Sequence, residues 1–417
     1  MEKDTDKRLV LENLRLGLPP GSPYALEALT VTLRHDIFAF WISRYLEDFI
    51  AAGGSKVKFL LGNPGSGKTH ALLLLQHKAR MMNYIDVFID ARSVRLHQFN
   101  TIYQAVMESV DIENLVRVYS AGLVGKLGYQ AEAQDMLPGP GAFFNLAVNR
   151  GRAEESLRRD IHEQLEALHQ DRKIHHHVAT AFTHLCTDYL GSRPLEYEQR
   201  ENLIQWLKGR IIPAKDLRKL HIFSRIDKFN ARYMLGSLAH LAKRCGYLGF
   251  YVAVDGLETL LEKDENGRSR YGRTARNEVY ESLRQLIDDF VEFEGVFFVF
   301  AARPEILHDE KAGLKSYEAL WMRVQNEVTG SRVNLFADMV NQDMLVREYL
   351  DQAACTALCS KMDSYFGNRA ENEIDPAREL QAAGIVSPLR RVVAALAQER
   401  PDFNDAMDAL RSDEDGG

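Results

Sequence analysis

Residues 62–69, with the sequence GNPGSGKT, have the residue types and the spacing of a phosphate-binding loop, G-x-x-x-x-G-K-[ST]. The glycines let the backbone curl so that successive amides can donate to phosphate oxygens, and a following helix adds its positive end. Lys68 can reach the β- and γ-phosphates of a nucleotide, and the Thr69 hydroxyl can ligate Mg²⁺. The loop therefore predicts binding of a nucleoside triphosphate with Mg²⁺. The residues assigned to this site are Gly62, Asn63, Pro64, Gly65, Ser66, Gly67, Lys68, Thr69 and His70.

A carboxylate for the magnesium shell is predicted at Asp255, which closes the apolar run Phe250–Val254. Activation of water requires an acidic residue directly after it, but Gly256 has no side chain. Glu258 lies three residues beyond Asp255, and in a helical turn it can return to the same side. It can then act as a substitute base or pair with a nearby arginine. We expect slow hydrolysis with nucleotide binding intact, because loss of a general base lowers a rate by roughly 10²–10⁴-fold.

An arginine follows a second apolar run. Val296–Ala302 has the composition of a buried strand, and Arg303 comes directly after it. A cation at this strand end can contact the γ-phosphate, because arginine donates hydrogen bonds to phosphate in a fixed fork geometry. A surface ion pair is the alternative for Arg303.

Strands and helices must hold these residues in place. Apolar runs bounded by turn residues predict strands at Lys56–Leu61, Asp86–Asp90, Phe250–Val254 and Gly295–Ala302. Helical patterns are predicted at about 36–52, from the loop to about Met81, and at 275–293. A strand–loop–helix–strand unit of this kind is typical of an α/β fold with a parallel sheet flanked by helices.

The domain organisation follows from where the strand signals stop. Between residues 98 and 245 the pattern is helical, which predicts a large insertion in the α/β core. The predicted units are an N-terminal helical arm (1–54), a core (55–97 and 246–340), the helical insertion (98–245) and a C-terminal helical lid with a disordered tail (341–417).

The bulk composition narrows the class of protein. The chain has 417 residues, of which 46% are hydrophobic and 27% charged, as in a folded globular protein of two or three domains. Its formal charge of −7 gives no global attraction to nucleic acid. The four scattered cysteines suit a reducing compartment. No apolar run reaches about 18 residues and the N-terminus resembles no signal peptide, so we expect a cytoplasmic protein without a membrane span.

Two further features have competing interpretations. The segment 208–232 is locally cationic and can contact the phosphates of duplex DNA, or form a solvated or intersubunit salt-bridging face. Its basic residues are Lys208, Arg210, Lys215, Arg218, Lys219, Arg225, Lys228 and Arg232, against Asp216 and Asp227. Three consecutive histidines, His175, His176 and His177, suggest a metal site. Consecutive helical residues point in different directions, so a solvated helix face is expected instead.

Ordered segments of the chain resemble the ATP-binding proteins of BREX-type bacterial anti-phage systems, the BrxD-like group. These are P-loop ATPases of the AAA+ type, close to the origin-recognition and Cdc6 branch. The loop alone belongs to a superfamily with many functions, and only the ordered set is specific to this family. The segments that carry the resemblance are ENLRLGLPPG, FLLGNPGSGKTHALLLLQHKA, LAHLAKRCGYLGFYVAVDGLETL, NEVYESLRQLIDDF, and GVFFVFAARPEIL followed by SYEALWMRV.

The resemblance implies an AAA+-type parallel sheet with ATP and Mg²⁺ as ligands. It makes Lys68 and Thr69 the phosphate and Mg²⁺ residues and Asp255 the Walker B aspartate and second Mg²⁺ residue. Arg303 falls at the sensor-1 position. Arg323, in LWMRV, falls where such proteins often carry an arginine aimed at a neighbour's nucleotide, which implies a homo-oligomer.

The chain departs from the family in two places. The segment SPLRRVV, residues 387–393, resembles the Ser-Pro-Arg start of a sensor-2 helix, but Leu389 takes the place of the arginine. Arg390 is then a displaced candidate, or a surface arginine of a helix. Second, the family tends to have Asp-Glu-x-Glu where this chain has Asp255–Gly256–Leu257–Glu258.

The function that the resemblance implies is an ATP-binding subunit of a phage-defence assembly. Its ATP state would control assembly, or DNA engagement by its partners, which would be other subunits of the defence complex. A DNA-stimulated ATPase that loads or remodels, and a nucleotide-locked scaffold that never hydrolyses, are the alternatives.

Overall fold

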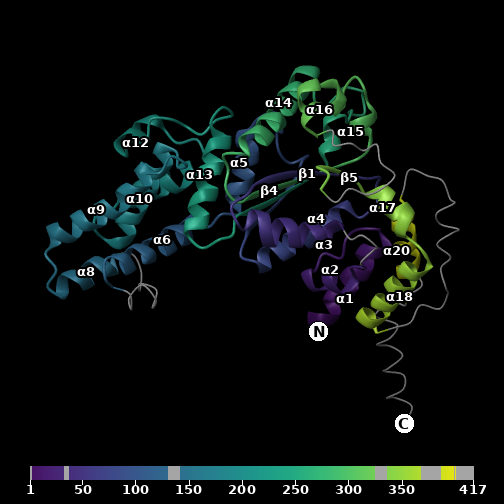
Figure 1. Ribbon diagram of the computed structural model, residues 1–417, viewed down its shortest axis with the longest axis horizontal. Coiled ribbons are helices and arrows are strands. Elements are labelled where there is room, and N and C mark those ends of the chain that lie inside the picture. The colour runs from purple at the N-terminus through teal and green to yellow at the C-terminus, as the bar shows by residue number, and fades with distance from the viewer. Residues whose placement is uncertain are drawn as a thin grey trace, which may run out of the picture.

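The computed structural model describes residues 2–31, 37–129, 141–324, 336–367, 387–398 and 400 (Figure 1). At its centre lies a five-stranded, all-parallel sheet with the order β2-β3-β4-β1-β5. The α/β fold with a parallel sheet flanked by helices is therefore confirmed. The strands are β1 (Lys56–Leu61), β2 (Ile85–Asp90), β3 (Phe250–Asp255), β4 (Val296–Ala302) and β5 (Met339–Asn341).

The order of the strands determines which residues share an edge of the sheet. Strand β4 lies between β1 and β3, so the strand that leads into the phosphate-binding loop does not pair with the strand that ends at Asp255. In the register, Asp255 lies opposite Ala301 of β4 and opposite Asp90 of β2. Because all strands are parallel, the loop after Leu61, the Asp255 carboxylate and Arg303 lie at one edge.

Alternate strand residues face opposite sides of the sheet, and each side has its own apolar core. Phe59, Val252 and Phe298 belong to the core on the side of α5 (Phe99–Glu108), α13 (Ala231–Arg244) and α14 (Arg273–Asp289). Their neighbours Leu60, Tyr251 and Phe297 pack on the other side. The helices on that side are α3 (Ile37–Trp41), η1 (Ile42–Ile50) and α4 (Lys68–Met81). The helix predicted at about 36–52 is thus a short α-helix that continues as the π-helix η1.

Between β2 and β3, the described residues form helices and turns without a strand. Several of these helices extend as an arm away from the sheet, on the left in Figure 1. Their apolar side chains continue the core of one sheet face, so the arm and the sheet share one cluster of buried residues. The helices are α6 (Ile112–Lys126), α8 (Ala142–Asn149), α9 (Glu154–Gln170), α10 (His176–Leu190), α11 (Tyr197–Leu207) and α12 (Ala214–Lys219).

The two ends of the chain form a third core. Val10 of α1 (Glu2–Arg15) is buried with Met362 of α18 (Gln352–Phe366) and Leu396 of α20 (Pro388–Gln398). Helices α2 (Pro23–Leu29) and α17 (Gln342–Tyr349) complete this cluster, at the lower right of Figure 1. No helix among the described residues is both long and apolar enough to cross a membrane.

Candidate nucleotide-binding site

The predicted loop connects the end of β1 to the first residue of α4. Gly65 and Gly67 adopt left-handed backbone conformations, with φ of +82° and +90°. A Cβ atom on Gly65 would also lie 2.3 Å from Cβ of Arg390, so glycine is required there for both reasons. The glycines therefore permit both the curl of the loop and the close approach of the C-terminal helices.

Lys68 is curled over the loop that precedes it. Its Nζ donates hydrogen bonds to the carbonyl oxygens of Gly62, at 2.6 Å, and Asn63, at 3.2 Å. Burial lowers the pKa of Lys68, because removal from water disfavours the charged ammonium. Three carboxylates act in the opposite direction on this pKa, those of Glu258, Asp255 and Asp343. The ammonium is thus held at the loop by backbone carbonyls, from which it can turn to a phosphate.

The Thr69 hydroxyl and the Asp255 carboxylate meet across the edge of the sheet. Thr69 Oγ1 donates a hydrogen bond to Asp255 Oδ2 at 2.6 Å. Mg²⁺ is bound through oxygen, most often by one or two protein groups together with phosphate oxygens and water. A hydroxyl and a carboxylate in contact, beside a lysine and a loop of backbone amides, fit this ion. These two side chains would hold it, and the ion would supply charge neutralisation at the phosphates.

Glu258 pairs with Arg303. The glutamate lies in the short 3-10 helix η2 (Leu257–Leu260), and its Oε1 is 3.1 Å from Arg303 Nε. Its other oxygen, Oε2, accepts a hydrogen bond from the backbone amide of Arg303 at 3.2 Å. Glu258 was interpreted either as a substitute base or as the partner of an arginine, and in the structure it forms an ion pair with Arg303. The arginine is itself occupied at this carboxylate, and its side chain remains 43% exposed.

Gly256 has a left-handed conformation, with φ of +87°. Its amide donates to the carbonyl oxygen of Ala301 at 3.1 Å. A Cβ atom on Gly256 would meet only Asp90 within 4 Å, with Oδ1 at 3.8 Å. Asp90 ends β2 and is exposed, so it is an acidic side chain beside the position of the missing glutamate. This neighbour could not be predicted from local sequence, because the contact depends on the pairing of β2 with β3.

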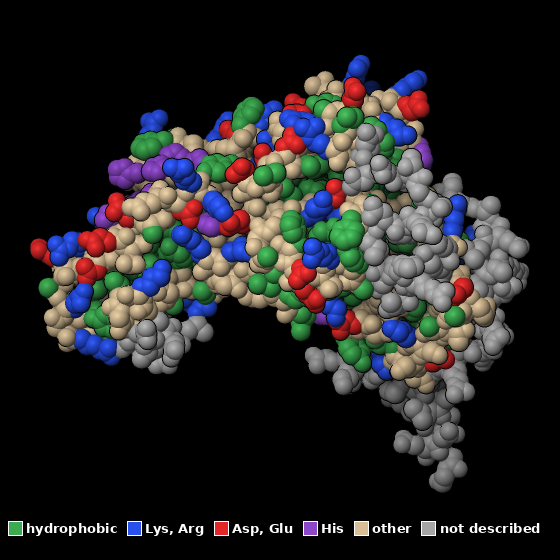
Figure 2. All heavy atoms as spheres, in the orientation of Figure 1, with side chains coloured by type: hydrophobic (Ala, Val, Ile, Leu, Met, Phe, Trp, Pro, Cys, Tyr) green, Lys and Arg blue, Asp and Glu red, His purple; other side chains and the backbone are tan. Residues whose placement is uncertain are grey.

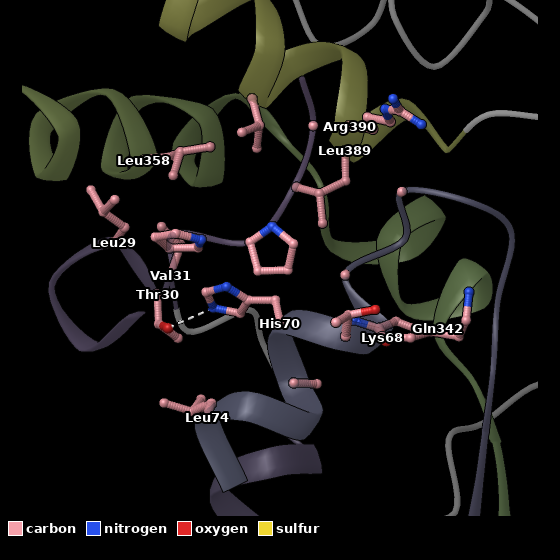
Figure 3. Close-up of a pocket in the computed structure, with 18 of the residues that line it drawn as sticks. Leu29, Thr30, Val31, Lys68, His70, Leu74, Gln342, Leu358, Leu389 and Arg390 are labelled. Atoms are coloured by element: carbon pink, nitrogen blue, oxygen red, sulfur yellow. Dashed lines mark hydrogen bonds between the residues drawn. The ribbon is translucent and has the colours of Figure 1, made fainter. Parts of the chain in front are cut away.

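The C-terminal helices lie directly against the loop. The amide of Ser387 donates to the carbonyl oxygen of Pro64 at 3.0 Å. Arg390 passes beside Gly65, but its Nη2 donates to the carbonyl oxygen of Leu16 at 2.8 Å. Figure 3 shows the guanidinium of Arg390 turned away from His70, whereas the side chain of Leu389 points into the cavity. The displaced sensor-2 candidate thus lines the cavity next to the loop, but its guanidinium is directed to Leu16.

Two residues at the start of α17 contact the loop and were not predicted. Oδ2 of Asp343 accepts a hydrogen bond from the amide of Asn63 at 2.8 Å. Burial raises the pKa of Asp343, and the Asn63 amide and the Lys68 ammonium oppose this shift. The side chain of Gln342 is buried beside Gly67, and its Oε1 has no hydrogen-bond partner among the described residues. Both residues follow the three-residue strand β5, which is too short to leave a strand pattern in the sequence.

A cavity of about 370 Å³ opens beside the loop. Its walls are mainly apolar and come from α2, α4, α18 and α20 (Figure 3). The apolar side chains that line the cavity include Leu29, Val31, Leu74, Leu358 and Leu389. The cavity therefore lies between both ends of the chain and the P-loop helix.

His70 is the main polar side chain on the apolar side of this cavity. Its Nε2 lies 2.8 Å from Thr30 Oγ1, the dashed line in Figure 3. Thr30 Oγ1 also donates to the carbonyl oxygen of Leu26 at 2.5 Å, so the hydroxyl proton is already used. His70 Nε2 is then the donor to Thr30, which leaves Nδ1 as an acceptor. Burial lowers the pKa of His70 to about 4, so the ring is neutral at neutral pH.

Arg323 lies elsewhere in the fold. Helix α16 (Glu318–Val324) carries it, and its guanidinium binds Asp288 of α14, with Nε to Oδ1 at 2.5 Å and Nη2 to Oδ2 at 3.1 Å. It lines a cavity with Lys56 and Val57, at the start of β1 and away from the loop at the strand's other end. The structure therefore does not bring Arg323 to the loop of its own chain.

The cationic segment 208–232 is partly neutralised by acids from other elements. Arg210 pairs with Glu108, Lys228 with Glu278 at 3.6 Å, and Arg232 with Asp289 at 3.0 Å. Lys219 is 3.4 Å from Asp216 within the segment. Among the residues that the structure describes, no group of three or more His, Cys, Asp or Glu side chains is arranged to hold a metal ion.

Comparison with known proteins gives one match. No curated protein and no solved structure matches the chain. The protein family described as BREX system ATP-binding protein BrxC/D matches residues 3–400, nearly the whole sequence. The chain therefore belongs to the BrxC/BrxD family of BREX system ATP-binding proteins.

Proposed function

We propose that this protein is an AAA+-type ATP-binding subunit of a BREX phage-defence assembly, with ATP state controlling assembly or DNA engagement by its partner subunits. One observation carries the proposal: Lys68, Thr69 and Asp255 meet at the mouth of the loop, beside an apolar cavity. Lys68, Thr69 and Asp255 supply an ammonium, a hydroxyl and a carboxylate for a triphosphate and Mg²⁺. The cavity supplies apolar walls for a base.

The polar groups of the cavity favour adenine as the base. His70 Nδ1 is an acceptor on a neutral ring, and the exocyclic amine of adenine is a donor. A guanine presents a carbonyl oxygen at the corresponding position, which an acceptor does not satisfy. A buried polar group without a partner costs about 1–3 kcal/mol, which is enough to distinguish the two nucleotides.

Nucleotide state would reach the rest of the protein through the C-terminal helices. The loop is bonded to them at two points, Asn63 to Asp343 and Pro64 to Ser387. A triphosphate brings negative charge next to the Asp343 carboxylate and competes for the same amides. Binding would therefore shift the C-terminal helices relative to the loop, and partners that contact those helices would sense it.

Hydrolysis is proposed to be slow. The position of the water-activating acid is occupied by Gly256, and Glu258 is engaged by Arg303. Neither residue is placed to take a proton from water without rearrangement. A bound ATP would then persist long enough to act as a signal for assembly.

The first experiment measures binding of ATP with Mg²⁺ by isothermal titration calorimetry. Lys68→Ala is expected to lose detectable binding, while Lys311→Ala, which removes an exposed lysine outside the site, binds like the wild type. Removal of Mg²⁺ with a chelator is expected to weaken binding in the wild type. Wild-type affinity in Lys68→Ala would rule out the proposed site. A parallel titration with GTP tests the preference for adenine.

A DNA-stimulated ATPase is the second candidate, and the position of Asp90 favours it. Its carboxylate lies beside the place of the missing glutamate and can supply a base from the neighbouring strand. Steady-state phosphate release, with and without duplex DNA, separates the candidates. DNA-stimulated turnover that Asp90→Asn removes supports the ATPase. Release at the background rate in both conditions supports a nucleotide-locked scaffold.

A further inference from the structure

Four aromatic rings form a continuous strip on the projecting arm. In order they are Tyr233, His175, His177 and Phe223, and consecutive ring centroids are 5.4, 5.4 and 6.1 Å apart. We call this set the ring strip. It joins three elements that are distant in sequence: the start of α13, the start of α10 and the segment after α12. Figure 2 shows histidine side chains gathered with hydrophobic and basic side chains on this part of the arm.

Both ends of the ring strip are exposed, its two imidazoles are half-buried between them, and its members are held in place. Phe223 is 68% exposed and Tyr233 is 45% exposed. Tyr233 donates its hydroxyl to the carbonyl oxygen of Arg172 at 3.2 Å, and the amide of His175 donates to Ser237 Oγ at 2.9 Å. The amide of His177 donates to Nδ1 of His175 at 3.1 Å. Exposed rings that continue into a supported cluster are typical of an interaction surface, whereas single surface aromatics are common on any protein.

The imidazoles of the ring strip are uncharged near neutral pH. Burial lowers the pKa of His175 and of His177, and the neighbouring imidazoles lower it further. The strip is therefore a set of neutral rings rather than a row of cations, and consecutive rings are tilted by 69°, 45° and 59° to one another. Planar neutral rings are suited to stacking, and they offer little to a partner that is recognised by charge alone.

Cations lie at both ends of the ring strip. In the segment 221–226, Ile222 and Ile226 are buried, at 1% and 6% exposed, whereas Phe223 and Arg225 are both exposed. At the other end, Arg172 is exposed beside Tyr233. Neither Arg172 nor Arg225 forms an ion pair within the described ranges of the chain. The guanidinium groups remain available for phosphates.

We propose that the ring strip binds single-stranded nucleic acid, with bases stacked on the rings and phosphates at Arg172 and Arg225. Base–aromatic stacking tolerates any sequence and combines with cationic contacts to the backbone in proteins that bind single strands. The bases of a duplex are stacked on one another and cannot cover the rings. A duplex would use only the cations and leave the exposed rings without a role.

The test measures binding of fluorescently labelled oligonucleotides by anisotropy, using the full chain. The probes are oligo(dT), oligo(rU) and a mixed-sequence duplex, which also separates DNA from RNA as the source of the strand. The wild type is expected to prefer the single strands to the duplex. Phe223→Ala is expected to weaken single-strand binding by about 5- to 100-fold, while Phe223→Trp, which keeps a ring, retains it.

Matched controls separate the ring strip from general surface effects. Tyr197→Ala removes another exposed aromatic of the arm, 80% exposed on α11, and is expected to bind like the wild type. Arg225→Gln is expected to lower the salt dependence of binding by about 0.7 in log–log slope, as for one lost phosphate contact on a single strand. Arg159→Gln, which removes an exposed arginine on α9, is expected to leave that slope unchanged.

Three outcomes would overturn the proposal. The first is a duplex bound as tightly as the single strands. The second is single-strand binding that Phe223→Trp loses, or that Phe223→Ala keeps in full. The third is no binding of any of the probes by the wild type. Because the ring strip lies outside the nucleotide site, Lys68→Ala is expected to bind the oligonucleotides in the absence of ATP, whatever its own ATP affinity.

Discussion

The carboxylate of Glu258 holds Arg303 through both of its oxygens, one 3.1 Å from the guanidinium Nε and the other accepting the backbone amide at 3.2 Å. The two residues follow the ends of neighbouring strands, β3 and β4, at the edge that carries the phosphate-binding loop. A glutamate in this arrangement positions an arginine, and an arginine in this arrangement is kept from moving freely to a phosphate. The ion pair must break before Glu258 can act as a base or Arg303 can contact a phosphate.

A double-mutant cycle on this pair separates positioning from base catalysis. If Glu258 acts by holding Arg303, then Glu258→Gln and Arg303→Gln change ATP affinity and phosphate release similarly, and the double variant is little worse. The coupling energy of such contacting pairs is about 0.5–3 kcal/mol. Single-turnover phosphate release and nucleotide titration provide the two measurements. A loss of roughly 10²–10⁴-fold in Glu258→Gln alone, with Arg303→Gln near wild type, would instead identify Glu258 as the base.

Substitution of Gly256 by glutamate is expected to cost stability and to raise hydrolysis. The left-handed φ of +87° disfavours any residue with a side chain, by about 1–2 kcal/mol. Gly256→Ala carries the same strain without the acid, so it is the matched control. We expect both variants to unfold at lower urea concentration, and only Gly256→Glu to release phosphate faster than the wild type. Equal rates in all three proteins would mean that the missing acid does not limit turnover.

Substitutions of the neighbouring residues Leu389 and Arg390 are expected to have different effects on ATP affinity. Leu389 points into the cavity, so Leu389→Arg should strengthen ATP binding by about tenfold or more, since a charge-assisted hydrogen bond contributes about 1.5–3 kcal/mol. Arg390→Ala should leave ATP affinity close to wild type and lower thermal stability, because Arg390 binds the Leu16 carbonyl. Calorimetry and a thermal melt test both. Loss of ATP affinity in Arg390→Ala would assign it the sensor role despite its orientation.

Asp343→Asn is expected to bind ATP more tightly. The asparagine oxygen can still accept the Asn63 amide, but the negative charge beside the loop is removed. Repulsion of about 1 kcal/mol in a partly solvated site corresponds to roughly a fivefold gain in affinity. The same titration on Asp309→Asn, an acid on a surface turn, is the control. Weaker binding in Asp343→Asn would show that the carboxylate supports the loop rather than opposing the phosphates.

Lys58 should make the stability of the fold depend on alkaline pH. Its fully buried Nζ donates to the carbonyl oxygens of Phe336 and Ala337, both at 2.8 Å, and burial lowers its pKa from 10.5 to about 8. Between pH 8 and 10.5 the unfolded chain binds more protons at this residue than the folded one. The free energy of unfolding should therefore rise with pH across that window, by up to about 3 kcal/mol.

Urea unfolding at pH 7.5, 8.5 and 9.5 measures this slope. The range stops before the titration of Tyr45, whose ring lies 4.6 Å from Lys58 Nζ and whose pKa is raised to about 12 by burial. Lys58→Met is the comparison, because it has no titrating group at this position. A wild-type slope no steeper than that of Lys58→Met would contradict the lowered pKa.

Much of the site followed from local sequence. The loop and its helix are specified by glycine spacing and by the lysine and threonine that follow, and four strands were recognisable as apolar runs. Asp255 closes one of those runs, and parallel strands place such residues at one edge. The contact between Thr69 and Asp255 is therefore a consequence of features that are visible before folding.

The remaining parts depend on long-range packing, which leaves no local pattern. Thr30 meets His70 only because α2 packs on α4. Asp343 reaches the loop because β5 pairs with β1, and β5 has three residues. The ring strip joins residues around 175, 223 and 233, which are distant in sequence. From the three histidines we could infer only a metal site or a solvated helix face. The contact between His177 and Phe223 could not be predicted.

The core that the two ends of the chain share has a consequence for synthesis. Arg15 of α1 donates to the Ala397 carbonyl of α20 at 3.2 Å, and α20 also closes the cavity beside the loop. While the ribosome is still making the middle of the chain, α1 has already emerged but its partner does not yet exist. The nascent protein can assemble its five-stranded sheet once β5 has emerged, yet it cannot enclose a base until translation has passed α20. Nucleotide capture would thus report that the polypeptide has been completed at least to α20.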